Sequence, residues 1–151
     1  MKVKKILWPT DFSENAAKAQ PYVTSLTEQY QTEVHVLYVM DPLPYDELAY
    51  HGPWADFDPS QMDKIRQWEK EQAKERLDGI CDRYLKGCPL YVRHVATGDP
   101  AKEILKFIEE EKVGMVVMAS RGQKGFYFGS VTEKVVKNSP VPVVTIPVSP
   151  E

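Results

Sequence analysis

Residues 113–133 read VGMVVMASRGQKGFYFGSVTE, and this stretch determines how the rest of the chain is arranged. Its first seven residues are almost all apolar, which is typical of a strand buried on both faces. Three glycines follow before a helical pattern begins at Ser130. A buried strand that passes through a glycine turn into a helix is a building unit of a parallel α/β sheet.

The same alternation of apolar and helical segments continues through the chain. Short apolar runs typical of strands occupy residues 3–8, 34–40, 90–96, 113–119 and 141–146. Helical patterns occupy residues 13–30, 61–85, 100–111 and 130–138. Strands that alternate with helices pair in parallel through right-handed crossovers. We therefore predict one α/β domain over residues 1–151, built as an open five-stranded parallel sheet with helices on both faces.

Two helical segments carry specific expectations. In the third, Ala101 and Ile104 recur at helical spacing, Asp99 fits the N-cap and Pro100 the first helical position. In the first, Pro21 should kink the helix or shift its start, because proline lacks the N–H that a helix interior needs.

The second helical segment is long and charged, and we expect its first half to project from the body. A sparse apolar stripe is predicted to be its buried face: Ile65, Trp68, Leu77, Ile80, Cys81, Tyr84 and Leu85.

Composition excludes several classes of protein. A net charge of −3 with mixed signs along the chain disfavours nucleic acid as a partner. No apolar run approaches the roughly 20 residues of a membrane span, and the N-terminus lacks a signal-peptide pattern, so we expect a cytoplasmic protein without membrane contact. Cys81 and Cys88 match neither a redox pair nor a zinc site, and Cys81 is expected to be a core or semi-exposed thiol.

In an open parallel sheet, ligands bind at the carboxyl ends of the strands, where the strand order reverses. If the first strand is central, residues 9–13 and 118–130 meet at that point. The second of these segments holds the glycine turn. Glycines permit close backbone approach, and a helix N-terminus offers unpaired N–H groups, so the turn suits a phosphate.

Each feature of this turn has a structural alternative. Ser130 and Glu133 have the spacing of a capping box, which would explain the serine without a ligand. Arg121 and Lys124 are placed to neutralise phosphate, or are simply solvated. The spacing of the glycines matches neither a Walker loop nor a dinucleotide fingerprint.

Asp11 follows the first strand and would face the glycine turn, where its carboxylate can accept a ribose hydroxyl or an adenine amino group. The alternative is an N-cap of the following helix, a role that Ser13 fills equally well. Val39 and Met40 end the second strand and would form an apolar wall for a flat base, or belong to the core.

Catalytic machinery is not visible in the sequence. Ser120 and Ser130 lie in the loop, but no nucleophile elbow surrounds them. His35, His94 and His51 have no metal-ligand spacing and are expected to be structural. We therefore expect neither an enzyme nor a metal site.

Residues 41–60 are too long for an ordinary connection and contain four aromatic side chains. We interpret them as a lid or a partner-contact loop, the alternative being that the aromatic rings pack on the second helix.

Four segments together resemble the universal stress protein family over essentially the whole chain. They are KKILWPTDFSE (4–14), VHVLYVMD (34–41), GDPAKEI (98–104), and VVMASRG (116–122) with GSVTEKVV (129–136) and VPVVTI (141–146). The resemblance implies a Rossmann-like sheet of order 3-2-1-4-5, similar to the adenine nucleotide alpha hydrolases. It also implies a homodimer through the last strand, here from Val141 to Val148. Some members bind ATP and others do not.

Transferring the binders' motif to this chain implies a site for ATP or AMP, with magnesium if a triphosphate is bound. The implied contacts are Pro9, Thr10, Asp11, Val39, Met118, Ala119, Arg121, Gly122, Gly129, Ser130, Val131 and Thr132. Two departures concern the phosphates. Ala119 replaces the first glycine of the motif, and six residues separate Gly122 from Gly129 where binders have nine.

Three functions stay open at this point. The protein is a stress-response module that binds an adenine nucleotide and acts as a homodimer, a family member that acts through protein contacts without nucleotide, or a slow ATPase. The glycine turn favours the first and its shortening favours the second. The missing base and metal carboxylates count against the third.

Overall fold

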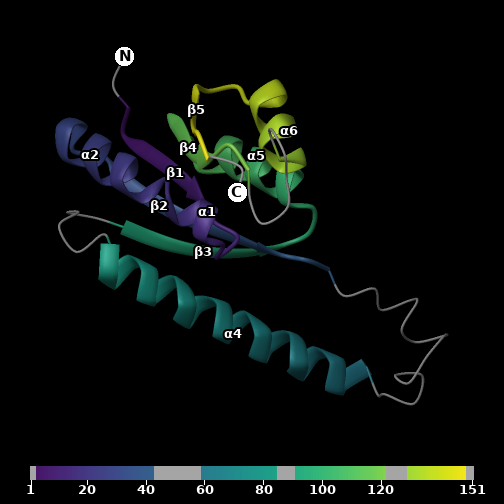
Figure 1. The fold of residues 1–151 in the computed structure, drawn as a ribbon. Coiled ribbons are helices and arrows are strands. Elements are labelled where there is room, and N and C mark those ends of the chain that lie inside the picture. The colour runs from purple at the N-terminus through teal and green to yellow at the C-terminus, as the bar shows by residue number, and fades with distance from the viewer. Residues whose placement is uncertain (1–2, 43–58, 85–90, 122–128, 149–151) are drawn as a thin grey trace.

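The computed structural model describes residues 3–42, 59–84, 91–121 and 129–148, which form a single sheet flanked by helices (Figure 1). The strands are β1 (Lys5–Pro9), β2 (Glu33–Met40), β3 (Tyr91–Thr97), β4 (Met115–Ala119) and β5 (Val143–Ile146). The helices are α1 (Glu14–Ala17), α2 (Gln20–Tyr30), α4 (Pro59–Tyr84), α5 (Pro100–Glu110) and α6 (Ser130–Asn138).

The strand order is β3-β2-β1-β4-β5 and every pairing is parallel, as predicted. Successive side chains of β1 point to opposite faces. Ile6 and Trp8 join a core cluster with residues of α2 and α4, whereas Leu7 joins a second cluster with residues of α5 and α6. The helices therefore cover both faces, with α2 and α4 on one side and α5 and α6 on the other.

The predicted first helix is divided in two at Pro21. Ser13 caps α1 by accepting a hydrogen bond from the Ala16 amide at 3.1 Å, and α1 ends after one turn. Helix α2 then starts at Gln20, so that Pro21 lies in its first turn, where its missing N–H has no intrahelical partner to lose. A single helix over residues 13–30 was wrong, and the shift of the start caused by Pro21 is confirmed.

Helix α5 matches its prediction closely. Asp99 accepts a hydrogen bond from the Lys102 amide, Pro100 is in the first turn, and Ala101 and Ile104 are buried. The cap and the apolar stripe lie within one short segment, which explains why this helix could be predicted from the sequence alone.

Helix α4 differs from its prediction at Trp68, which is 60% exposed. Leu77 and Cys81 are fully buried, so the buried line of the helix runs through them. Trp68 precedes Leu77 by nine residues, which at 3.6 residues per turn places it about 180° around the helix. It therefore lies off the buried line of the helix, at an open hollow that it lines together with Tyr38 and Arg76, and assigning it to the buried stripe was wrong.

Helix α4 is also longer than the strands that it covers. Its 26 residues span about 39 Å, whereas the seven residues of β3 span about 23 Å. In Figure 1 its N-terminal end extends past the sheet. Within residues 60–72 only Met62 is buried, in agreement with the expectation that the first half projects.

Two histidines form a polar pair between β2 and β3. His35 Nδ1 lies 2.9 Å from His94 Nε2, and His35 Nε2 lies 3.1 Å from a carboxylate oxygen of Glu33. Burial, and then the neighbouring His35, lower the pKa of His94 below its ordinary value. Both histidines lie within strands as predicted, while His51 is outside the described residues.

No helix in the described part of the chain has the length and apolar character that a bilayer requires.

Candidate functional site

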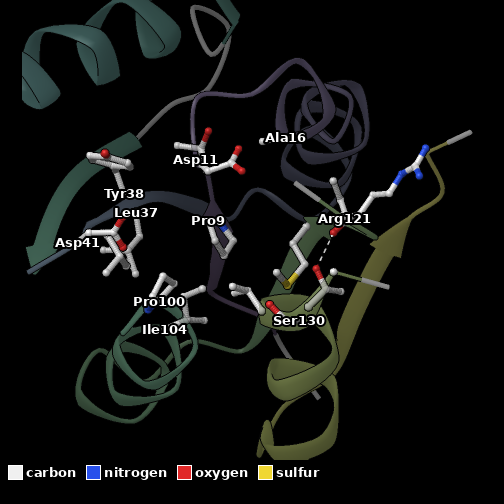
Figure 2. Close-up of a pocket in the computed structure, with 17 residues that line it drawn as sticks. Pro9, Asp11, Ala16, Leu37, Tyr38, Asp41, Pro100, Ile104, Arg121 and Ser130 are labelled. Atoms are coloured by element: carbon white, nitrogen blue, oxygen red, sulfur yellow. Dashed lines mark hydrogen bonds between the residues drawn. The ribbon is translucent and has the colours of Figure 1, made fainter. Parts of the chain in front are cut away.

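A cavity of about 510 Å³ opens at the carboxyl edge of the sheet (Figure 2). The ends of β1, β2 and β4 and the first turns of α5 and α6 surround it. In Figure 2 Pro9 lies at the centre, with Asp11 next to it, Tyr38 and Asp41 on the β2 side and Ser130 on the α6 side. Its volume lies within the range of about 300–1,000 Å³ that is usual for small-molecule sites.

The cavity brings together almost every site residue that the sequence predicts. The lining includes Pro9, Thr10, Asp11, Val39, Met118, Ala119, Arg121, Gly129, Ser130, Val131 and Thr132. Gly122 lies outside the described residues, as does most of the segment 41–60 that we interpreted as a lid or partner-contact loop. The predicted meeting of residues 9–13 with the start of α6 is therefore confirmed as geometry.

Six further residues line the cavity that were not predicted from the sequence: Ala16, Leu37, Tyr38, Asp41, Pro100 and Ile104. Pro100 and Ile104 belong to the first turns of α5, which packs beside α6 on the same face of the sheet. The cap at Asp99 marked where α5 starts, but its position next to the cavity depends on the crossover between β3 and β4.

The loop after β1 is held by a compact set of hydrogen bonds. The Thr10 amide donates to the Leu37 carbonyl at 2.9 Å, which joins the ends of β1 and β2. The Asp11 carboxylate accepts the Ser13 amide at 2.9 Å and also the Ser13 hydroxyl. Ser13 is thus the N-cap of α1, and Asp11 orients the capping residue instead of capping the helix itself.

The N-terminus of α6 faces the cavity without a side-chain cap. Gly129 is its N-cap and makes no side-chain capping bond. The Gly129 amide donates to the Ser120 carbonyl at 2.9 Å, and the Thr132 hydroxyl donates to the Ala119 carbonyl at 3.0 Å. These bonds fix the first turn of α6 against the end of β4, with its positive dipole end at the cavity.

The capping box proposed as the alternative for Ser130 is wrong. Ser130 is the first residue of the helix, one position after the cap, and it is exposed at the cavity. Glu133 turns the other way and pairs with Lys137 at 2.8 Å. The Lys137 ammonium lowers the pKa of the Glu133 carboxyl below its ordinary value.

Arg121 is buried at the rim of the cavity. In Figure 2 its side chain extends away from Pro9 and Ser130. The guanidinium is therefore not directed at the helix N-terminus, where it was expected to neutralise phosphate, and because it is buried it is not simply solvated either. Lys124 is outside the described residues.

Val39 and Met40 have different places. Val39 lines the cavity together with Leu37, since alternate residues of a strand share a face. Met40 is buried and does not line the cavity. The apolar wall therefore consists of Leu37 and Val39, and assigning Met40 to it was wrong. Within the described residues, no group of three or more His, Cys, Asp or Glu side chains is arranged to hold a metal ion.

Comparison with known proteins finds relatives of this chain both by sequence and by structure. The chain is 31% identical to the universal stress protein MJ0577 of Methanocaldococcus jannaschii, over 95% of this chain and 94% of that protein. A solved structure of the hypothetical protein MJ0577 superposes with a TM-score of 0.82 at 29% identity, covering all of both chains.

Two more distant structures share the fold and contain nucleotides. A universal stress protein family protein from Arabidopsis thaliana with AMP bound has a TM-score of 0.66 at 17% identity, covering 97% of this chain and 92% of that one. A universal stress protein in complex with cAMP has a TM-score of 0.63 at 14% identity, covering 99% and 100%. The model of the universal stress protein family matches residues 2–147. This chain belongs to the universal stress protein family.

Proposed function

We propose that the protein binds an adenine nucleotide in the cavity between β1 and β4. The observation that carries the proposal is the position of the Asp11 carboxylate and the uncapped N-terminus of α6 on the same cavity. A carboxylate accepts hydrogen bonds from ribose hydroxyls, and a helix N-terminus donates them to phosphate. A ligand that binds the Asp11 carboxylate and the α6 N-terminus at the same time therefore carries a sugar and a phosphate.

The apolar wall supplies the place for the base. Leu37 and Val39 present aliphatic side chains on the β2 side of the cavity, where a flat ring can lie. The AMP- and cAMP-bound relatives support adenine as that ring. In this arrangement the phosphate of AMP lies at the N-terminus of α6, and ATP would add two further phosphates, with magnesium.

A tryptophan placed at the mouth of the cavity tests this site. Ser130→Trp should weaken AMP binding by about tenfold or more, because the new ring occupies the space in front of the α6 N-terminus; a tenfold change corresponds to about 1.4 kcal/mol. Lys134→Trp is the matched control, since Lys134 is exposed one turn further along α6 and does not line the cavity. Calorimetric titration measures both. Equal AMP affinity in the two variants would place the nucleotide elsewhere.

A second candidate function is signalling through protein contacts without nucleotide, which the six-residue spacing between Gly122 and Gly129 favours. Native mass spectrometry of purified protein distinguishes the two, because it reports subunit number and retained nucleotide together.

We further propose that the protein binds and does not turn over its ligand. Steady phosphate release from ATP that Ser130→Trp abolishes would contradict this.

We also propose that the protein acts as a homodimer through β5. This strand is the edge of the sheet. The Pro142 carbonyl accepts the Val116 amide of β4 at 3.0 Å, and the Ile146 carbonyl accepts the Ser120 amide, just after β4, at 2.8 Å. Backbone groups of alternate residues point to opposite sides. The N–H and C=O groups of Val143 and Thr145 therefore face outward, where a second copy can pair with them across a two-fold axis.

Thr145→Pro should raise the dimer dissociation constant at least about fivefold, because each protomer loses one outward N–H and a hydrogen bond contributes about 0.5–1.5 kcal/mol. The pairing with β4 stays intact, since residue 145 points its N–H away from it. Thr145→Val keeps the N–H and is the control. Sedimentation velocity across a concentration series measures both. A wild-type protein that is monomeric at micromolar concentration, or an unchanged Thr145→Pro dimer, would contradict the proposal.

A further inference from the structure

Phe12 adopts a backbone conformation that a residue with a Cβ atom avoids. Its φ is 64°, in the left-handed region. It lies directly between Asp11 and Ser13, whose side chain and backbone are joined by hydrogen bonds. The direction of the Asp11 carboxylate therefore depends on the turn at Phe12.

The contacts of Phe12 show what maintains this turn. Its amide donates to the Thr10 hydroxyl at 3.1 Å, and its ring centre lies 4.4 Å from that of Tyr38. The Arg76 guanidinium lies over the ring, with its central carbon 4.1 Å from the ring centre. A cation at this distance is attracted to the negative face of an aromatic ring. Arg76 thus attaches the β1–α1 loop to helix α4.

Arg76 is available for this contact. In the described part of the chain it forms no ion pair within 4.0 Å, whereas Arg66, on the same helix, bonds the Asp41 carbonyl at 2.8 Å and Glu69 at 3.3 Å. Burial raises the pKa of the Tyr38 hydroxyl, the Asp41 charge adds to the rise, and the Arg76 charge opposes it. Tyr38 also lines the cavity, so the cluster of Phe12, Tyr38 and Arg76 lies at one border of the cavity.

We propose that Arg76 is a positioning residue for Asp11, acting through the Phe12 ring, so that the docking of α4 controls the ribose side of the cavity. This role rests on the proposed nucleotide function only in so far as adenosine is the ligand whose affinity changes. The contact between α4 and the loop also has consequences that are measurable without nucleotide.

The first measurement is hydrogen exchange at the Ser13 amide, which donates to Asp11. Arg76→Met keeps a long apolar side chain and removes the cation. Exposed cation–π contacts contribute about 0.5–1 kcal/mol, so exchange should be about two- to fivefold faster and adenosine affinity weaker by a similar factor. Arg76→Lys should restore most of both. The control is Arg93→Met, which removes a different contact of α4, the 2.8 Å ion pair between Arg93 of β3 and Asp78.

A double-mutant cycle separates this role from general stability. In a Phe12→Leu background, Arg76→Met should add nothing, because the ring is gone. If Arg76→Met speeds Ser13 exchange in the wild-type background but not in the Phe12→Leu background, the proposal is supported. This holds even if wild-type protein binds no adenosine, in which case the nucleotide function alone fails. Unchanged Ser13 exchange in Arg76→Met, or an equal change in Arg93→Met, overturns it.

Discussion

Replacing Asp11 by alanine should weaken adenosine, AMP and ATP by the same factor, about ten- to a hundredfold. The carboxylate faces the cavity at the end of β1, and a hydrogen bond to a charged group contributes about 1.5–3 kcal/mol. The factor is common to the three ligands because they share the ribose. Calorimetric titration of each ligand against wild type and Asp11→Ala gives the comparison.

Two further variants make this result specific. Asp11→Asn keeps an oxygen for the Ser13 amide and should lie between wild type and Asp11→Ala. Asp82→Ala removes an exposed carboxylate that accepts the Tyr91 hydroxyl away from the cavity, and should leave binding unchanged. Because the Gly122–Gly129 connection is short, we expect ATP and AMP to bind wild type within about tenfold of each other. A larger loss for ATP than for adenosine would mean that Asp11 acts on the phosphates.

Leu77→Ala should lower the free energy of unfolding by about 2–5 kcal/mol, the usual cost of removing a buried leucine side chain. Leu77 is fully buried where α4 packs on the sheet. Trp68→Ala removes a larger side chain from the same helix, yet should change stability by no more than about 0.5 kcal/mol, because Trp68 is exposed. Urea unfolding followed by far-ultraviolet circular dichroism suits both variants, since it does not depend on tryptophan fluorescence.

A Trp68→Ala variant as destabilised as Leu77→Ala would show that the Trp68 side chain is covered in solution. The aromatic side chains of residues 41–60 or a second copy of the chain would then be candidates, and the concentration dependence of unfolding would distinguish them.

The sheet and the position of the cavity follow from features that are local in sequence. Each strand is a short apolar run with its own stop signal, and alternation with helices fixes parallel pairing. Parallel pairing in turn places Asp11 and Ser130 at the same edge, so the site could be predicted before any contact was known.

Features that depend on the angle of a side chain could not be predicted in this way. Trp68 fits the apolar spacing of α4 but is exposed, off the buried line of the helix. Met40 is adjacent to Val39 but faces the other side of the sheet. The N-cap of α6 is Gly129 and not Ser130, one residue before the predicted position, because the Gly129 amide donates to the Ser120 carbonyl. The contact between Phe12 and Arg76 joins segments that no periodicity connects.

The central place of β1 has a consequence for synthesis. Ile6 pairs with Val34, which follows it closely in the chain, but its other neighbour, Met115, lies about 110 residues further along. Until β4 arrives, one edge of β1 is unpaired, and its side chains, almost fully buried in the finished protein, lack part of their cover. An unpaired apolar edge promotes association with other chains. Nascent or truncated chains that stop before β4 should therefore be prone to aggregation and depend on chaperones, and they cannot form the cavity at all.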